Sequence, residues 1–438
     1  MSALAVSTIS ITAILTLIGL RVPIGVALGG VAFIGFWSLS NWNVALSVLR
    51  ETPFVFSASW DLTAIPMFLL MGSLANNSGI SAALFRAARL WFGGMPGGLA
   101  VATNIACAGF AAACGSSVAA AAAMARLAIP EMLRQGYDKG LAAGVVASAG
   151  TLAALIPPSI LFVLYGIFAQ VSIAQLLIAG ILPGLLTAAI YSAMLLIRCR
   201  LDPTLAPLIR IEDRGALRRE RLDSLKEIWP LIALILGIIG GLYGGVVTPT
   251  EAGAGGALLA TLIGIFQRTI TLEKFLDSLK DSMTTTAQLF FVGMGAVMYT
   301  KLLALAGIGP MFTEMIGSWA VNPLLLVIAA SIIYLILGMF LDPLGIVLIT
   351  IPVLVPMFTA LHLDLVWFGV LVVKYVEIGM LTPPVGFNVY VVKNVVGDEI
   401  SLETIFRGCF WFLGCEVIIM TLLIAFPQIS LWLPYSMK

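Results

Sequence analysis

The chain has 438 residues, of which 61% are hydrophobic and only 10% are charged, and its mean hydropathy is +1.09. A soluble domain is about 45–50% apolar and about 25% charged, so this composition excludes a soluble globular protein and indicates a polytopic, all-α membrane protein. The net charge of +1 gives no reason to expect a nucleic-acid partner, and the single histidine, His362, excludes a histidine-based metal site and a Ser-His triad within the chain.

Fourteen apolar segments follow one another along the chain, and most approach the roughly 20 residues that a membrane span needs. The first has no basic residue before it and no small-residue cleavage site after it, so we interpret it as a span rather than a secretory signal. The segments lie at 5–20, 22–40, 62–78, 96–113, 117–132, 140–168, 172–197, 229–246, 251–267, 283–303, 322–340, 344–360, 366–395 and 405–427.

A basic run at 198–227 interrupts the apolar segments and contains eight of the 23 lysines and arginines. Cytoplasmic loops carry an excess of these residues, so we expect this linker to be cytoplasmic. Its second part, 210–227, is predicted to be a surface helix on the anionic leaflet, with a plain solvated linker as the alternative. Three amphipathic stretches are predicted to lie along the membrane interface, at 79–93, 269–281 and 309–319.

The proline pattern on the two sides of this linker repeats at a shift of 226 residues. Pro130 precedes the proline pair at 157–158 by 27 residues, and Pro356 precedes the pair at 383–384 by the same interval. The same shift places Ser116, in the polar break "ACGSSV", on Asp342, in the break "FLDPLG". We therefore predict an internal repeat, with one half at 1–197 and the other at 228–438.

Each half is predicted to contain about five transmembrane helices, one re-entrant hairpin and one broken helix. The hairpins are expected at about 96–132 and 322–360, and the broken helices at about 140–168 and 366–395. An odd number of crossings turns the second half upside down relative to the first. Fourteen full crossings, the rival count, would place the two polar breaks in loops that are too short and too apolar.

Proline pairs inside apolar segments leave backbone carbonyls and amides free at membrane depth, where they are tolerated only beside a cavity or a ligand. The N-termini of half-helices favour anions, and freed carbonyls can coordinate Na⁺. Inverted repeats with paired broken helices are typical of secondary transporters. The sequence therefore predicts a transporter.

At these residues the chain resembles the large membrane subunit of the tripartite ATP-independent periplasmic (TRAP) transporters. The matching stretches cover nearly the whole chain and include "TPTEAGA" (248–254), "GMFLDPLGIVLITIPVLVP" (338–356), "VEIGMLTPPVGFNVYVVK" (376–393) and the segment at 115–167 around "LIPPSILF". The resemblance implies an elevator-type ion transporter fold in the bacterial inner membrane. The charge asymmetry predicts that both termini are periplasmic, because this orientation places Lys139 and Lys393 on the cytoplasmic side and leaves little beyond Arg50 and Lys301 outside. The resemblance also implies import of a small organic acid driven by Na⁺, without an organic cofactor. A periplasmic solute-binding protein and a small four-helix membrane subunit would be its partners.

The resemblance also implies a site at the two hairpin tips. The family's tip serines match Ser116 and Ser117, and its acidic hairpin residue matches Asp342, so we expect Na⁺ near these three residues. Many relatives carry Asp or Thr where this chain has the alanines 119–123, so backbone carbonyls would supply more of the ligands. The full set of candidate substrate- and ion-binding residues is Gly115, Ser116, Ser117, Thr151, Pro157, Pro158, Asp342, Pro343, Glu377, Thr382, Pro383, Pro384 and Asn388.

Each of these residues also has a structural interpretation. Asp342 and the two serines can cap helices, and the prolines can serve the architecture alone. Glu377 follows Lys374 by three residues, so the two are expected to neutralise each other. Glu251 is expected to cap a helix, and the five cysteines are expected to be buried thiols.

Two other functions remain open from the sequence. A self-sufficient Na⁺/organic anion symporter of related fold would share the inverted repeats and need no binding protein. An intramembrane hydrolase using Ser116 or Asp342 lacks a second matched acid or base near either residue, and we do not expect an enzyme.

Overall fold

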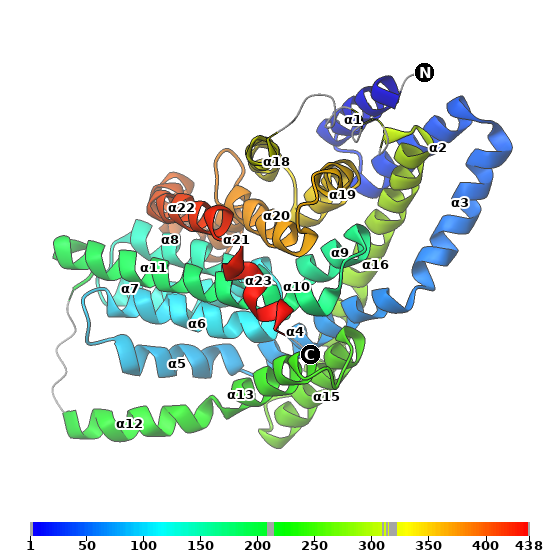
Figure 1. Cartoon of the computed structure of the whole chain (residues 1–438). Helices are drawn as coiled ribbons and strands as arrows, with labels where there is room; N and C mark the ends of the chain where they lie inside the picture. Colours follow the sequence, from blue (N-terminus) through cyan, green and yellow to red (C-terminus); the bar gives the residue numbers. More distant parts are fainter. Residues whose placement is uncertain (1–2, 208–213, 309–310, 312–313, 315–321, 437–438) are drawn as a thin grey trace.

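The structure is a computed structural model that describes residues 3–207, 214–308, 311, 314 and 322–436. All regular elements among the described residues are helices, and they pack side by side along an elongated body (Figure 1). The predicted all-helical fold class is therefore confirmed.

The helices before the central linker are α1 (Ala3–Gly19), α2 (Ile24–Leu39), α3 (Trp42–Ser57), α4 (Ala64–Asn77), α5 (Ile80–Phe92), α6 (Gly98–Cys114), α7 (Ser117–Arg134), α8 (Lys139–Gly150), α9 (Ile160–Ala169), α10 (Ile173–Ala179) and α11 (Ile181–Leu201). Those after it are α12 (Arg214–Glu227), α13 (Trp229–Ile235), α14 (Gly241–Tyr243), α15 (Pro249–Phe266), α16 (Leu272–Leu305), α18 (Pro323–Gly338), α19 (Pro343–Ala360), α20 (Leu365–Gly379), α21 (Phe387–Val396), α22 (Leu402–Ala425) and α23 (Gln428–Tyr435).

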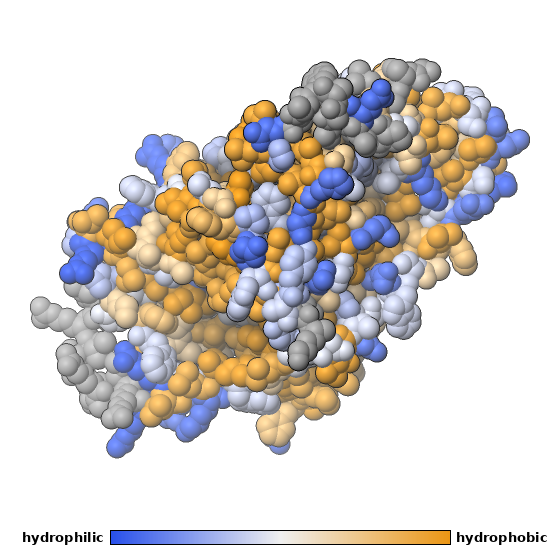
Figure 2. Space-filling model, in the orientation of Figure 1, coloured by the Kyte–Doolittle hydropathy of each residue, from blue (hydrophilic) through white to orange (hydrophobic). Residues whose placement is uncertain are grey.

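Five of the described helices are long and apolar enough to cross a membrane. Two further pairs of helices, bent by 55° and 44° at a short break, raise this number to seven if each pair is one span. Several apolar helices are shorter because they end at the predicted polar and proline breaks. Hydrophobic side chains also cover much of the visible surface (Figure 2). Large apolar residues inside the candidate spans, such as Leu258, Leu262 and Val417, are 54–68% exposed, as is expected of helices that face lipid.

The helix bounds recur at the shift that the prolines predict. Subtracting 226 from the bounds of α19 gives 117–134, which are the bounds of α7. The packing contacts also correspond between the halves. Helix α2 packs on α16, and its counterpart α15 packs on α4; helix α7 packs on α21, and its counterpart α19 packs on α9. This correspondence supports the repeat, whereas its boundaries and the opposite orientation of the halves stay predictions.

Two segments differ from the prediction, and a third cannot be compared. Residues 42–57, which we assign to no span, form helix α3, because its polar stretch from Arg50 to Pro53 lowers the hydropathy without preventing a helix. The predicted interfacial stretch 269–281 is not a separate arm but largely the first part of α16, which continues for 34 residues. Most of the stretch 309–319 lies outside the described residues.

The second part of the central linker forms a helix, α12, and not a plain solvated linker. It packs along α5, where Arg86 Nη1 lies 3.0 Å from Glu227 Oε2 and Arg221 Nε donates to the carbonyl of Leu90 at 2.8 Å. These contacts attach the linker to the predicted interfacial helix at 79–93, which is α5. Its position on the anionic leaflet stays a prediction.

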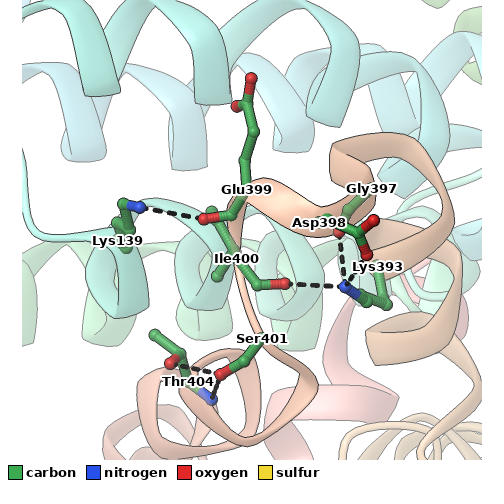
Figure 3. Close-up of polar contacts among 8 residues, drawn as sticks. All are labelled: Lys139, Lys393, Gly397, Asp398, Glu399, Ile400, Ser401 and Thr404. Carbon is green, nitrogen blue, oxygen red and sulfur yellow. Dashed lines mark hydrogen bonds and ion pairs between the residues drawn. The ribbon is translucent and has the colours of Figure 1, made fainter.

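Two lysines that we predict to be cytoplasmic meet at one loop, although they come from different halves (Figure 3). Lys139, at the start of α8, donates from Nζ to the carbonyl of Glu399 at 3.0 Å. Lys393, near the end of α21, donates to the carbonyl of Ile400 at 3.2 Å and lies 3.6 Å from Asp398. The loop between α21 and α22 therefore brings the two basic residues to one side of the molecule, as the charge pattern requires.

The predicted orientation can be tested with single cysteines, because the five native cysteines are all buried. We expect Asp223→Cys on α12 to react with a membrane-impermeant maleimide only from the cytoplasmic side, and Gln428→Cys on α23 only from the periplasmic side. Both native residues are exposed. Right-side-out and inverted vesicles distinguish the two, and reaction of both from the same side would refute the inverted topology.

Candidate functional site

The candidate site is built from the two hairpin tips and the two helix breaks. The first hairpin consists of α6 and α7, which pack on each other and are joined only by Gly115 and Ser116. Gly115 adopts φ +67°, a left-handed conformation that disfavours a side chain. A Cβ atom there would lie 2.6 Å from the carbonyl oxygen of Pro158. A glycine therefore lets the hairpin tip approach the proline break of its own half.

The first broken helix consists of two helices separated by a break. Helix α8 is followed by a 3₁₀ turn at Thr151–Ala154, and the helix resumes after the proline pair as α9. Ser159 caps α9 by accepting from Phe162 N at 3.3 Å, and Ile160 N donates to the carbonyl of Gly115 at 3.4 Å. Thr151 is buried and donates from its hydroxyl to the carbonyl of Ser148. The break thus lies directly beside the hairpin tip.

The second half repeats this arrangement. Helices α18 and α19 form the second hairpin, and Asp342 caps α19 by accepting from Leu344 N and Gly345 N, both at 3.1 Å. Helix α20 ends at Gly379, and a Cβ atom on Gly338 would lie 2.8 Å from its Cα. The hairpin and the broken helix of this half therefore also approach closely, because both carry glycine at the crossing.

The remaining candidates lie at the same breaks. The pairs Pro157–Pro158 and Pro383–Pro384 both contain a cis peptide bond, and Pro343 is the first residue of α19. Thr382 donates from Oγ1 to the carbonyl of Ile378, and Ser116 accepts from Ala119 N at 3.4 Å. Ser116 and Asp342 thus do cap helices, a role that leaves their ion-binding role a prediction.

Two contacts join the halves across the site. Ser117 Oγ on α7 donates to Glu377 Oε1 on α20 at 2.9 Å, and Asn388 Nδ2 on α21 donates to the carbonyl of Ala147 on α8 at 3.4 Å. Glu377 is 1% exposed and Asn388 is fully buried. Their other oxygens, Glu377 Oε2 and Asn388 Oδ1, are buried without a hydrogen-bond partner in the described part of the chain.

Lys374 does not pair with Glu377, so this prediction is wrong. Its Nζ lies 2.6 Å from Glu416 Oε1 on α22, and the Tyr191 hydroxyl on α11 donates to the same oxygen. Residues three apart on a helix point about 60° apart. Lys374 can therefore reach α22 while Glu377 faces α7.

Sequence reasoning missed Glu416 and Tyr191. Glu416 is an acid inside the predicted span 405–427, in "FLGCEVIIM", and an ionisable residue at membrane depth is a signal of function or of a buried partner. Lys374 gives the same signal in the span 366–395. A pairing of these two unexplained charges would have identified the contact.

The site can serve an anion and a cation together. Four helices begin at the breaks, namely α7, α9, α19 and α21, and helix N-termini stabilise negative charge. Hard cations prefer oxygen ligands, and the unpaired oxygens of Glu377 and Asn388 are of this type. Within the described residues no three His, Cys, Asp or Glu side chains gather as a metal site, so a bound cation would need hydroxyl, amide and carbonyl oxygens in addition to any carboxylate.

Residues 11–429 match the family described as tripartite ATP-independent periplasmic transporter, DctM component. The C4-dicarboxylate TRAP transporter large permease protein of Pseudomonas aeruginosa is 34% identical over 86% of this chain and 87% of its own length. The sialic acid TRAP transporter large permease protein of Vibrio cholerae is 33% identical over 86% of both chains.

Among solved structures, the YdaH transporter of Alcanivorax borkumensis has a similar fold. The TM-score is 0.62 at 15% sequence identity, and the match covers 88% of this chain and 90% of that one. At this identity the likeness concerns the fold alone.

Proposed function

The chain belongs to the DctM component family of the tripartite ATP-independent periplasmic transporters, and we propose that it moves both substrate and Na⁺ through such a transporter. It is a multi-pass membrane protein whose relatives are named transporter permeases, so the intramembrane hydrolase is set aside. The substrate in this proposal is a small organic acid.

The observation that carries the proposal is the Ser117–Glu377 contact at 2.9 Å, which joins a hairpin tip of one half to the broken helix of the other. With the hydrogen bond from the Asn388 amide to the carbonyl of Ala147, it holds both broken helices and the first hairpin together. We propose that the hairpins and broken helices move as one unit, as an elevator does. The remaining helices, including the pairs α2–α16 and α4–α15, would form the scaffold.

Na⁺ would be bound near the hairpin tips by Ser116, Ser117 and Asp342. The unpaired oxygens of Glu377 and Asn388 support this placement, because a buried carboxylate oxygen without a partner is costly and a cation removes that cost. The organic anion would lie at the N-termini of the half-helices, because the helix dipole favours negative charge there. Coupling follows if one tip holds the cation only when the anion is present.

In this proposal the chain works in the bacterial inner membrane with both termini in the periplasm. Its partners would be a small four-helix membrane subunit and a periplasmic solute-binding protein, and its exposed apolar surface would face lipid and the small subunit. The alternative is a self-sufficient Na⁺/organic anion symporter. No described feature favours this alternative.

Uptake into proteoliposomes tests the proposal. We expect saturable uptake of a carboxylate only when an inward Na⁺ gradient, the small subunit and the binding protein are all present. Leaving out any one of the three should reduce uptake to the level of empty liposomes. Robust saturable uptake by this chain alone would identify the self-sufficient symporter, and uptake without Na⁺ would reject Na⁺ coupling.

A further inference from the structure

A cavity of about 360 Å³ lies between helices α3, α9 and α16, and no residue of the hairpin tips lines it. Its floor is aromatic: Phe56 packs against Phe168, with ring centroids 6.1 Å apart, and both rings line the cavity. Its polar lining includes Thr52, Ser59 and Lys301. Small-molecule sites share this composition, with mostly apolar walls and a few polar groups that fix orientation.

Lys301 gives the cavity a positive charge that has no acidic partner among the residues described. Its Nζ lies 3.2 Å from Thr52 Oγ1, and Thr52 is 1% exposed. The ammonium has three donors, of which this contact uses one. The acid on the same stretch of α3, Glu51, instead accepts from Ser47 and does not line the cavity.

We infer that this cavity is a binding site for a carboxylate, which Lys301 holds by charge and Thr52 and Ser59 by their hydroxyl groups. The inference rests on the proposed function, since it deepens it by naming where the organic acid would first contact this chain. Lys301 and the neighbouring Arg50 are predicted to lie on the outer side, where a binding protein would release its cargo. A cationic cavity raises the local concentration of an anion there.

The adjoining cavity limits where the anion can lie. This second cavity of about 350 Å³ shares Ser59, Ile167 and Gln170 with the first, but it contains Asp61. The Asp61 carboxylate would repel an anion, so the carboxylate group is expected on the Lys301 side of Ser59. Gln170 already donates from Nε2 to the carbonyl of Ile167 and serves as part of the wall.

Occupancy can be measured without transport by protecting an engineered thiol. Ser59→Cys in the assembled transporter, reconstituted without Na⁺, is expected to react with an uncharged maleimide. At least one of four carboxylates, namely acetate, pyruvate, succinate and sialic acid, should slow this reaction at least fivefold at millimolar concentration. Ser57→Cys, which is exposed and does not line the cavity, is the matched control and should not be protected.

The charge is tested by combining Ser59→Cys with Lys301→Gln, which should abolish the protection, while Lys301→Arg should retain it. In uptake assays Lys301→Gln should raise the external carboxylate concentration for half-maximal uptake about tenfold and leave the maximal rate unchanged, because it removes one charge-assisted contact. Arg50→Gln, an exposed cation outside the cavity, should have little effect.

Three results would overturn the inference: no protection by any of the four carboxylates, equal protection after Lys301→Gln, or an equal effect of Arg50→Gln on uptake. Uptake by the wild type that does not depend on Na⁺ would instead reject the proposed coupling, and it would leave the result of the protection assay unaffected. The two failures are therefore distinguishable.

Discussion

Glu416→Gln is expected to lower the free energy of unfolding by about 3–5 kcal/mol, because it leaves the Lys374 ammonium as an uncompensated buried charge. Lys374 and Glu416 are 0% and 2% exposed, and their charged atoms are 2.6 Å apart. Solvent screens such a pair very little. Denaturant-induced unfolding of the purified protein in detergent, followed by tryptophan fluorescence, measures the loss.

The same helix supplies a matched control. Glu403 and Arg407 form an exposed pair on α22, with side chains 74% and 75% exposed, and Glu403→Gln should change stability by less than about 1 kcal/mol. The double variant Lys374→Met/Glu416→Leu should recover most of the loss, since it removes both charges and retains apolar volume. Equal effects of Glu416→Gln and Glu403→Gln would show that the buried pair contributes little.

The positions of the breaks could be predicted from the sequence because local chemistry causes them. Proline ends or kinks a helix wherever it occurs, and a polar turn within an apolar run is visible in the sequence itself. The shift of 226 residues therefore identified α19 as the counterpart of α7 before any packing was known. The hairpin tips at Ser116 and Asp342 followed from the same signals.

The partners of the side chains could not be predicted in this way. The Ser117–Glu377 contact joins residues 260 positions apart, and the Lys374–Glu416 contact depends on which helix packs beside α20. A local rule proposed Glu377 as the partner of Lys374, but a neighbouring helix offered a better-placed carboxylate. Likewise, hydropathy could not identify α3, because its polar residues lower the hydropathy although the segment is helical.

Asp342→Asn is expected to raise the Na⁺ concentration for half-maximal uptake by about one to two orders of magnitude, while stability is retained. The Asp342 carboxylate accepts from two backbone amides at the start of α19, and asparagine caps a helix about as well as aspartate. The substitution therefore removes the charge but keeps the cap. Losing a charged contact of about 1.5–3 kcal/mol with Na⁺ gives the expected shift.

Asp364→Asn is the control for the cap itself. Asp364 caps α20 with the same geometry, accepting from Val366 N and Trp367 N at 2.8 and 3.0 Å, but it belongs to no predicted ion site. The Asp364→Asn variant should leave the Na⁺ dependence of uptake unchanged. Ser116→Ala should weaken Na⁺ binding less than Asp342→Asn does, because a neutral hydroxyl contributes less than a charge. Na⁺-dependent uptake by the complete transporter measures all three variants. If Asp342→Asn behaves like Asp364→Asn, the Asp342 carboxylate is a helix cap and the cation is held by other oxygens.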